Sequence, residues 1–410
     1  MPKEIDSIPV ARPSFDGSEL MGIRAVLESG WVAQGPEVER FEKLIALREG
    51  ARFGVAASSC TAALQLAIRA LGVGKGHDVI VPAFTFIATA NAVVSEGATP
   101  IFADVDEETF TLSISALKNT VLSYELREGA LINPATGNAL RLIIPVHLFG
   151  LCADIPAVNA IALKAGLLVL EDAACAIGAR IGEKGQGTFA NPSCLSFHPR
   201  KSITTGEGGM VLTDDEALAE SMRSLRSHGA EVSGYERHTK KDYGLLMPEF
   251  NGHGYNFRMT DVQAAMGIAQ AARLDSFIAE RRKLAEYYSS LLEDIGYLKI
   301  PHAPPGYLHT YQSYVCRVDE KAAGGLAQAH QLRNNVMLAL AKRNISTRAG
   351  THALHNTGYY KRLYSLRESD FPAADRCEKL SIALPLFVGM TRAQQELVAK
   401  ELATAFKNLS

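Results

Sequence analysis

The sequence lacks the features that mark a secreted, membrane-spanning or disulfide-stabilised protein. Its 410 residues include only six cysteines, which are scattered and form no C-x-x-C pair. This usage is typical of reduced thiols and favours neither a disulfide framework nor a zinc site, so we expect no metal. No run of about 18 apolar residues is present, and the N-terminus carries prolines and mixed charges instead of an apolar signal. We therefore expect a soluble cytoplasmic protein without a membrane partner.

An excess of charge of one sign is also missing. The formal net charge is −2, so nothing in the composition calls for nucleic acid or an anionic membrane as a partner. Hydrophobic residues make up 47% of the chain and charged residues 21%, which is ordinary for a globular protein. The length exceeds what one compact core accommodates and predicts about two domains.

Short apolar runs alternate with helical patterns between about residues 50 and 215. Four of these runs read as strands: Asp78–Val81, Thr99–Ala103, Leu142–Val146 and Leu167–Leu170. Helical patterns such as Ala62–Leu71 and Ile155–Ala165 separate them. Near-continuous apolar strands with helices between them predict an α/β fold, with a mostly parallel central sheet flanked by helices.

The second half of the chain has a different pattern. Residues Arg258–Leu292 predict one long helix, and a proline-rich break follows at Pro301–Gly306. Beyond it we expect a strand at Thr310–Val318 and helices at Gln331–Arg343 and Arg392–Lys407. We therefore predict a large domain over residues 1–260, including an N-terminal arm, and a smaller α+β domain over 261–410.

A lysine on a turn is the first candidate for chemistry. A strand-like segment that begins at Ser193 ends in a turn carrying Lys201, and the glycine-rich stretch Gly206–Gly209 follows. A Schiff-base lysine needs partial desolvation, so that its neutral amine is accessible, and glycines let the backbone approach a ring closely. The alternative is a surface lysine beside a glycine turn.

A carboxylate at a strand end is the second candidate. Asp172 follows the apolar run Leu167–Leu170, and the end of a parallel strand faces the crevice where ligands bind. A pyridinium nitrogen needs such an anionic partner, and the small Ala174 would lie against the ring face. The alternative for Asp172 is a helix N-cap.

Two further signals concern a phosphate and a ring. Cys60 and Thr61 open the helical pattern at Ala62, and a helix N-terminus offers free N–H groups to an anion. Plain N-capping is the alternative. Phe86 lies at the end of the Val81 strand, where an aromatic side chain would stack on a ring or simply join the core. Together the four signals meet the needs of one cofactor, pyridoxal 5′-phosphate (PLP).

These motifs resemble the DegT/DnrJ/EryC1/StrS family of nucleotide-sugar aminotransferases, which have the fold of type I PLP enzymes. The resemblance extends over nearly the whole chain and is most specific around Lys201. It is carried by these segments: Ile8–Pro13, Gly35–Glu42, Phe84–Asn91, Pro145–Gly150, Glu171–Ala174, Ser196–Gly209, Gly254–Thr260 and Ala383–Leu386.

The resemblance implies a role for each matching residue. Lys201 would hold PLP as a Schiff base and shuttle protons, while Asp172 would pair with the ring nitrogen. Phe86 would stack on the ring, and the backbone of Cys60 and Thr61 would bind the phosphate together with the Ser196 hydroxyl. Asn256 would reach the phosphate of the neighbouring subunit, which implies a homodimer with shared active sites.

Two cysteines depart from the family pattern. Cys60 stands where glycine is usual, although its backbone N–H remains available. Cys175 stands where glutamine or histidine usually contacts the ring hydroxyl, and a thiol is a poorer hydrogen-bond partner. How residue 175 affects the electronic properties of the cofactor ring therefore stays open.

The activity implied is transfer of an amino group from L-glutamate to a keto group of a nucleotide-linked sugar. The stretch Thr347–His355 resembles perosamine-type enzymes and favours a 4-keto-6-deoxyhexose, with Trp31 and His352 as candidate substrate contacts. For both residues the alternative is packing. Other readings are a PLP-dependent sugar dehydratase, which would have histidine in place of Lys201, a keto-cyclitol aminotransferase, and a non-catalytic PLP-binding regulator. The nucleotide, the sugar and the stereochemistry of amination stay open, as does assembly beyond a dimer.

Overall fold

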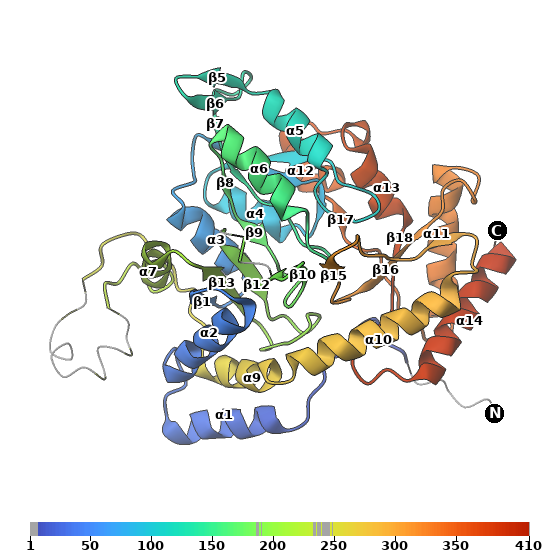
Figure 1. Ribbon diagram of the computed structural model, residues 1–410, viewed down its shortest axis with the longest axis horizontal. Helices are drawn as coiled ribbons and strands as arrows, with labels where there is room; N and C mark the ends of the chain where they lie inside the picture. Colours follow the sequence, from blue (N-terminus) through green and yellow to red (C-terminus); the bar gives the residue numbers. More distant parts are fainter. Residues whose placement is uncertain are drawn as a thin grey trace.

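A computed structural model describes residues 7–185, 188–189, 191–232, 235, 239, 247 and 249–409. Two groups of strands lie at the centre with helices around them (Figure 1). Helices α1, α2 and α9 lie together below the sheets in this view, and α10 leads from them toward α11 and α14. The α/β fold class predicted from the sequence is confirmed.

The first sheet is built around parallel strands. These are β4 (Thr99–Ala103), β2 (His77–Pro82), β7 (Ala139–Ile143) and β8 (Leu168–Val169), which lie side by side in that order. Val79, Ile80 and Val81 are fully buried, as expected for a strand covered on both faces. An antiparallel hairpin, β5 (Glu125–Arg127) and β6 (Ala130–Ile132), extends the sheet beyond β7.

The second sheet joins the first at Asp172. Its order is β1 (Phe53–Ala57), β13 (Gly209–Thr213), β12 (Ser193–Ser196) and β9 (Glu171–Asp172). Only the β12–β9 pair is parallel, because β13 returns directly from the lysine turn and pairs antiparallel with both neighbours. A parallel bridge between Val146 and Asp172 connects the two sheets, so the strand end at Asp172 lies at their junction.

Helices cover the sheets. They are α1 (Ser18–Ser29), α2 (Pro36–Glu49), α3 (Cys60–Ala70), α4 (Ala88–Ser95), α5 (Ile114–Leu122), α6 (Ile155–Ala165), α7 (Glu216–Leu225) and α9 (Asp261–Ala271). Pro36 sits at the first position of α2, where its missing N–H costs nothing. The Asp261 carboxylate accepts from the N–H groups of Gly35 and Val38, so the start of α9 fixes the start of α2.

The single helix predicted over Arg258–Leu292 is wrong. The structure has two helices, α9 and α10 (Leu274–Leu292), and Arg273 between them has non-helical dihedral angles. Its guanidinium pairs with Glu19 on α1 and holds this junction. The helical spacing of apolar residues continues across the break: Ala271 and Leu274 lie three positions apart, and both are buried. Periodicity alone could not reveal the interruption.

The C-terminal part has its own apolar core. An antiparallel sheet of β14 (Leu298–Lys299), β16 (Tyr314–Val318) and β18 (Ser381–Leu384) packs with α11 (Leu326–Ala341) and α14 (Arg392–Leu409). The predicted strand at Thr310 begins four residues later, since Tyr311 has a positive φ of 48°. The two ends of α10 lie in different cores: Leu274 packs near Phe41, and Tyr288 packs in the C-terminal core. The domain limit at residue 260 stays a prediction.

Short elements connect the two parts. They are β3 (Phe84–Thr85), β17 (His352–Ala353), β10 (Arg180–Ile181), β11 (Lys184–Gly185), β15 (Tyr307–Leu308), α12 (Gly358–Tyr364), α13 (Pro372–Leu380) and the 3₁₀ turns Leu354–Asn356 and Glu368–Asp370. The pairing of β17 with β3 forms a separate two-stranded sheet and brings a C-terminal segment next to the residues that follow β2. Within the described residues, no helix combines the length and apolar character needed to cross a bilayer.

Candidate active site

Lys201 lies on a tight turn after β12. Its N–H donates to the His198 carbonyl at 2.8 Å, and the N–H of Thr205 returns to the Phe197 carbonyl. The half-buried side chain places Nζ 3.0 Å from Sγ of Cys175. The lysine is therefore held in a fixed turn and does not project freely from the surface.

The protonation of Lys201 differs from the sequence-based expectation. Burial alone disfavours the ammonium ion, but the hydrogen bond to Cys175 and the acidic groups nearby, Asp172 among them, outweigh it, and the pKa of Lys201 is raised. The neutral amine is thus less accessible than the turn alone suggested. The reason is the ring of acidic groups around it, which composition and spacing could not reveal.

Asp172 ends β9 and is 4% exposed. Its carboxylate accepts from Thr89 Oγ1 at 2.7 Å and from the Ala174 N–H at 3.2 Å. Burial raises its pKa, opposed by these hydrogen bonds and by the charges of Lys201 and His147. A turn and not a helix follows Asp172, so the N-cap alternative does not hold. A buried carboxylate of this kind is an expected partner for a cationic ligand atom.

The start of α3 offers backbone donors that suit an anion. Ser59 caps the helix by accepting from the Ala62 N–H at 3.1 Å, as the capping alternative expected. Among the described contacts the N–H groups of Cys60 and Thr61 donate to no acceptor, so they remain available to an anion. The Cys60 thiol donates away from the turn, to the Cys194 carbonyl at 3.9 Å. The departure at residue 60 therefore leaves both N–H groups free.

Gly209 and Ser196 complete this turn. They are directly paired in β13 and β12. A Cβ atom at Gly209 would lie 2.4 Å from the Ser59 carbonyl oxygen and 2.5 Å from the Cys60 nitrogen. Only glycine permits the strand to pass this close to the turn. The Ser196 hydroxyl on the paired strand accepts from the His198 N–H at 3.5 Å.

The remaining predicted residues fall into two groups. Phe86 is 59% exposed just beyond β3, and its ring centroid lies 6.4 Å from that of the exposed His352. Ala174 is half-buried between Asp172 and Cys175. The Phe86 carbonyl accepts from Thr89 Oγ1 at 3.3 Å, so Phe86 lies beside the residue that contacts Asp172.

Trp31 and Asn256 lie elsewhere in this chain. The Trp31 indole donates to the Gln34 carbonyl at 3.0 Å, packs over Gly35 and lies 5.2 Å from the ring of Tyr235. These contacts favour packing at the start of α2. Asn256 is exposed and bridges Ser227, consistent with a residue that acts outside its own chain.

Three residues were missed by the motif analysis. Thr89 on α4 fixes the Asp172 carboxylate, and it lies inside the Phe84–Asn91 segment that carried the family resemblance. The fully buried His147 contacts Glu171 Oε2 at 3.0 Å. Arg348 is half-buried near Cys175, with a pKa lowered by burial and by Arg200. Sequence spacing could not link these three residues to the lysine, because they come from segments that lie far apart along the chain and meet only in the fold.

The residues present fit PLP. A buried carboxylate suits a protonated ring nitrogen, two free helix N–H groups suit a phosphate, and a lysine amine suits an aldehyde carbon. The close approach permitted by Gly209 keeps the phosphate turn against β13. No group in the described site has the wrong chemistry for these contacts.

Comparisons with known proteins agree with this fit. The profile of the DegT/DnrJ/EryC1/StrS aminotransferase family matches residues 13–403. The chain is 36% identical to the spore coat polysaccharide biosynthesis protein SpsC of Bacillus subtilis, over 94% of this chain and 93% of that one.

Solved structures show the same fold. The aminotransferase TlmJ from Streptoalloteichus hindustanus is 28% identical with a TM-score of 0.84, over 98% of this chain and 99% of that chain. The sugar aminotransferase Spr1654 from Streptococcus pneumoniae, in its PLP form, has a TM-score of 0.86 at 24% identity, over 98% and 100%. The latter likeness concerns the fold alone.

Proposed function

Because the chain belongs to the DegT/DnrJ/EryC1/StrS family of PLP-dependent aminotransferases, we propose that it moves an amino group from L-glutamate to a keto group of a nucleotide-linked sugar. The acceptor we propose is a 4-keto-6-deoxyhexose. One observation carries the proposal: Lys201, Asp172 and the two free N–H groups of α3 converge where the two sheets meet.

Binding and orientation fall to the strand ends. The Cys60 and Thr61 N–H groups and the Ser196 hydroxyl bind the phosphate, while Asp172, oriented by Thr89, holds a proton on the ring nitrogen. Phe86 covers the ring face. The relative SpsC is named for polysaccharide biosynthesis, which supports a sugar as the acceptor.

Proton transfer falls to Lys201. When bound, PLP supplies the electron sink that makes the C–H bond beside the donor nitrogen breakable. Lys201 Nζ then takes the proton from the donor α-carbon and delivers it elsewhere in the same site, as a general base and then an acid. Asp172 is buried, so it would hold a proton on the ring nitrogen with little competition from water.

A visible absorption experiment tests the donor half-reaction. The purified chain with PLP is titrated with L-glutamate, beside Lys201→Ala and with L-alanine as an alternative donor. We expect L-glutamate to convert the lysine-bound cofactor band to the pyridoxamine phosphate band in the parent protein and not in Lys201→Ala. An unchanged band with L-glutamate would overturn the donor assignment, and the absence of any lysine-bound band would overturn the site.

A substrate panel tests the acceptor. The pyridoxamine phosphate form is mixed with 4-keto and 3-keto nucleotide sugars and with a keto-cyclitol. We expect the 4-keto-6-deoxy sugars to restore the original band fastest and to gain the nitrogen. Faster restoration by the cyclitol, or release of ammonia in place of an aminated product, would replace the proposed acceptor or reaction.

We also propose a homodimer in which Asn256 completes the neighbouring site. Its side chain is exposed, which supports a role in contact with another chain. Mixing Lys201→Ala with Asn256→Ala tests it, because a mixed dimer would contain one site with both native residues. We expect activity to reappear on mixing two inactive variants. Full additivity without recovery would contradict shared sites.

A further inference from the structure

The contact between Lys201 and Cys175 is imposed by the sheet. Cys175 lies three residues beyond β9, and Lys201 lies five residues beyond β12. These strands are parallel neighbours, with Ser193 paired to Glu171 and Cys194 to Asp172. Two turns that leave the same edge in the same direction therefore place Nζ 3.0 Å from Sγ.

Lys201 donates to the Cys175 sulfur, and a second cationic side chain, Arg348, lies in the same region. The backbone of Arg348 pairs with Ala383 of β18. Within the described part of the chain, the half-buried Arg348 guanidinium forms no ion pair and no hydrogen bond, so no carboxylate there neutralises its charge. The Asp172 carboxylate opposes the positive charge of Lys201. A partly exposed thiol beside two cations has the setting of a reactive cysteine.

The other cysteines provide the contrast. Cys194, Cys316 and Cys377 are fully buried, and Cys152 is 2% exposed. Burial raises the pKa of each of these thiols. Burial also raises the pKa of the half-buried Cys60, whose thiol donates to a backbone carbonyl. Cys175 alone among the six has a lysine amine as its hydrogen-bond donor.

We propose that Cys175 and Lys201 are a paired modification site, at which a peroxide joins the sulfur to the lysine nitrogen through a reversible S–N bond. This inference uses only the contact between the two side chains. It therefore stands or falls separately from the identity of the donor and the acceptor sugar.

The chemistry balances in two steps. The Cys175 thiolate attacks one peroxide oxygen, the O–O bond breaks, and the leaving hydroxide takes a proton from the Lys201 ammonium to give water. Sulfur is oxidised by two electrons, and the peroxide is reduced. The neutral Lys201 amine then attacks the sulfur of the sulfenic acid, and the S–OH oxygen leaves with one amine proton as a second water. The net change to the protein is the loss of two hydrogens.

The consequence is a site that PLP protects. A lysine bonded to the cofactor cannot attack sulfur, and a lysine bonded to sulfur cannot take the cofactor. A thiol reductant would attack the sulfur and break the S–N bond, which would restore the free cysteine thiol and the free lysine amine. The cysteine at this position thus gives the chain a reversible block of its own catalytic lysine.

Mass spectrometry of the full-length chain tests the proposal. Samples with and without saturating PLP are treated with dilute hydrogen peroxide, alkylated and digested with trypsin. Without PLP we expect a mass loss of about 2 Da. We expect it on a peptide pair that joins residues 165–180, which contain Cys175, to the segment beginning at Lys201. Trypsin should fail to cleave after the linked lysine, dithiothreitol should reverse the link, and PLP should reduce its yield by about tenfold or more.

Variants separate the outcomes. Lys201→Arg keeps a cation beside the sulfur, so it should yield a sulfenic acid that dimedone captures, without the link. Cys175→Ser should abolish both products, and Cys60→Ser should keep the link. A disulfide between Cys60 and Cys175 also loses two hydrogens, but it joins different peptides, and finding it instead would overturn the proposal. Oxidation of Cys175 to higher acids with a free Lys201 would also overturn it.

Discussion

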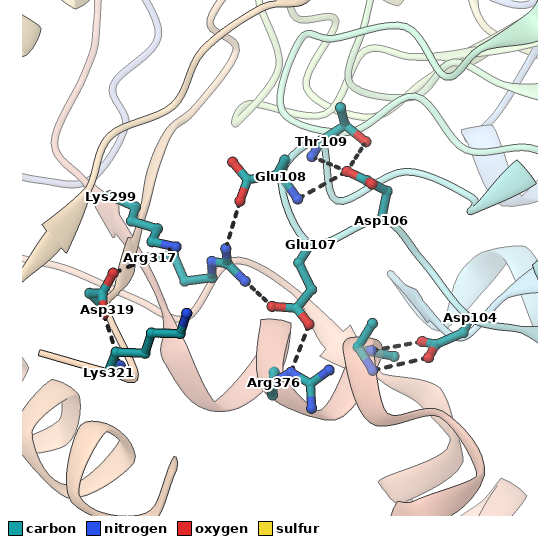
Figure 2. Close-up of polar contacts among 12 residues, drawn as sticks. Asp104, Asp106, Glu107, Glu108, Thr109, Lys299, Arg317, Asp319, Lys321 and Arg376 are labelled. Atoms are coloured by element: carbon teal, nitrogen blue, oxygen red, sulfur yellow. Dashed lines mark hydrogen bonds and ion pairs between the residues drawn. The ribbon is translucent and has the colours of Figure 1, made fainter. Parts of the chain in front are cut away.

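Asp104 and Asp172 occupy equivalent places in the sheet, and the structure gives them opposite tasks. Asp104 directly follows β4 and Asp172 is the last residue of β9, and these two strands run in the same direction. Asp104 accepts from the N–H groups of Ala373 and Ala374 at 3.0 and 2.8 Å, so it caps α13 from across the fold (Figure 2). Asp172 caps no helix and faces Lys201. The difference lies in what the rest of the chain brings to each strand end.

Ion pairs near Asp104 join the two parts of the chain. We call the ion pairs of Glu107 and Glu108 with Arg317 and Arg376 the clasp. Glu107 pairs with Arg317 of β16 and with Arg376 of α13, and Glu108 pairs with Arg317 at 3.1 Å (Figure 2). Every carboxylate of this clasp is met by a protein donor. Near Lys201, by contrast, the Arg348 guanidinium and two helix N–H groups have no partner among the described residues. Satisfied polar groups mark a structural contact, and unsatisfied ones mark a place for a ligand.

The largest effect should come from replacing the two aspartates in parallel. Asp172→Asn keeps the shape but cannot hold a charged ring nitrogen, so the half-reaction with the amino donor should slow by about 10²–10³-fold. Asp104→Asn retains a good cap and should stay close to the parent rate. Stopped-flow absorbance with PLP-loaded protein measures both. Equal losses in the two variants would show that Asp172 acts only through the fold.

This pair also shows how far the sequence could lead. The run before Asp172 predicted a strand-end carboxylate, and the family motifs selected Asp172 over the chemically similar Asp104. Pattern alone could not do so, because the partner helix of Asp104 begins at Pro372, far along the chain. Long-range contacts likewise decide the break before α10 and the raised pKa of Lys201. Local periodicity fixes strands and helices, whereas these features depend on tertiary neighbours.

The next effect concerns the stability of the clasp. Glu107→Gln removes the charge that faces the 7% exposed Arg317, and it should lower the free energy of unfolding by about 2 kcal/mol. Glu108→Gln is the matched control, because its side chain is 58% exposed and its pair should contribute less than about 1 kcal/mol. Scanning calorimetry should rank the parent and Glu108→Gln above Glu107→Gln. The reverse order would mean that Glu108 contributes more to the stability of the clasp than Glu107.

A smaller loss should follow from removing the cap of α13. Asp104→Ala leaves the N–H groups of Ala373 and Ala374 without their acceptor, which should cost about 1 kcal/mol. Asp104→Asn should recover most of it, since asparagine caps about as well as aspartate. Thermal melts of the three proteins at neutral pH measure this. A melt of Asp104→Ala identical to the parent would mean that the α13 terminus is held by other contacts.

The smallest effect is the pH dependence of Asp172 in the cofactor-free chain. Burial raises its folded pKa above the ordinary value of 3.8, so the folded state binds a proton more readily than the unfolded state. The charged form therefore lowers stability at neutral pH, and this cost disappears as the pH falls through the folded pKa toward the unfolded one. Asp172→Asn should melt higher than the parent at neutral pH, with a gap that closes on acidification. Saturating PLP should reverse the order at neutral pH, because a charged ring nitrogen would then pair with the carboxylate. Asp104→Asn should show neither behaviour. If PLP left the order of the melts unchanged, Asp172 would not be the residue that meets the cofactor ring.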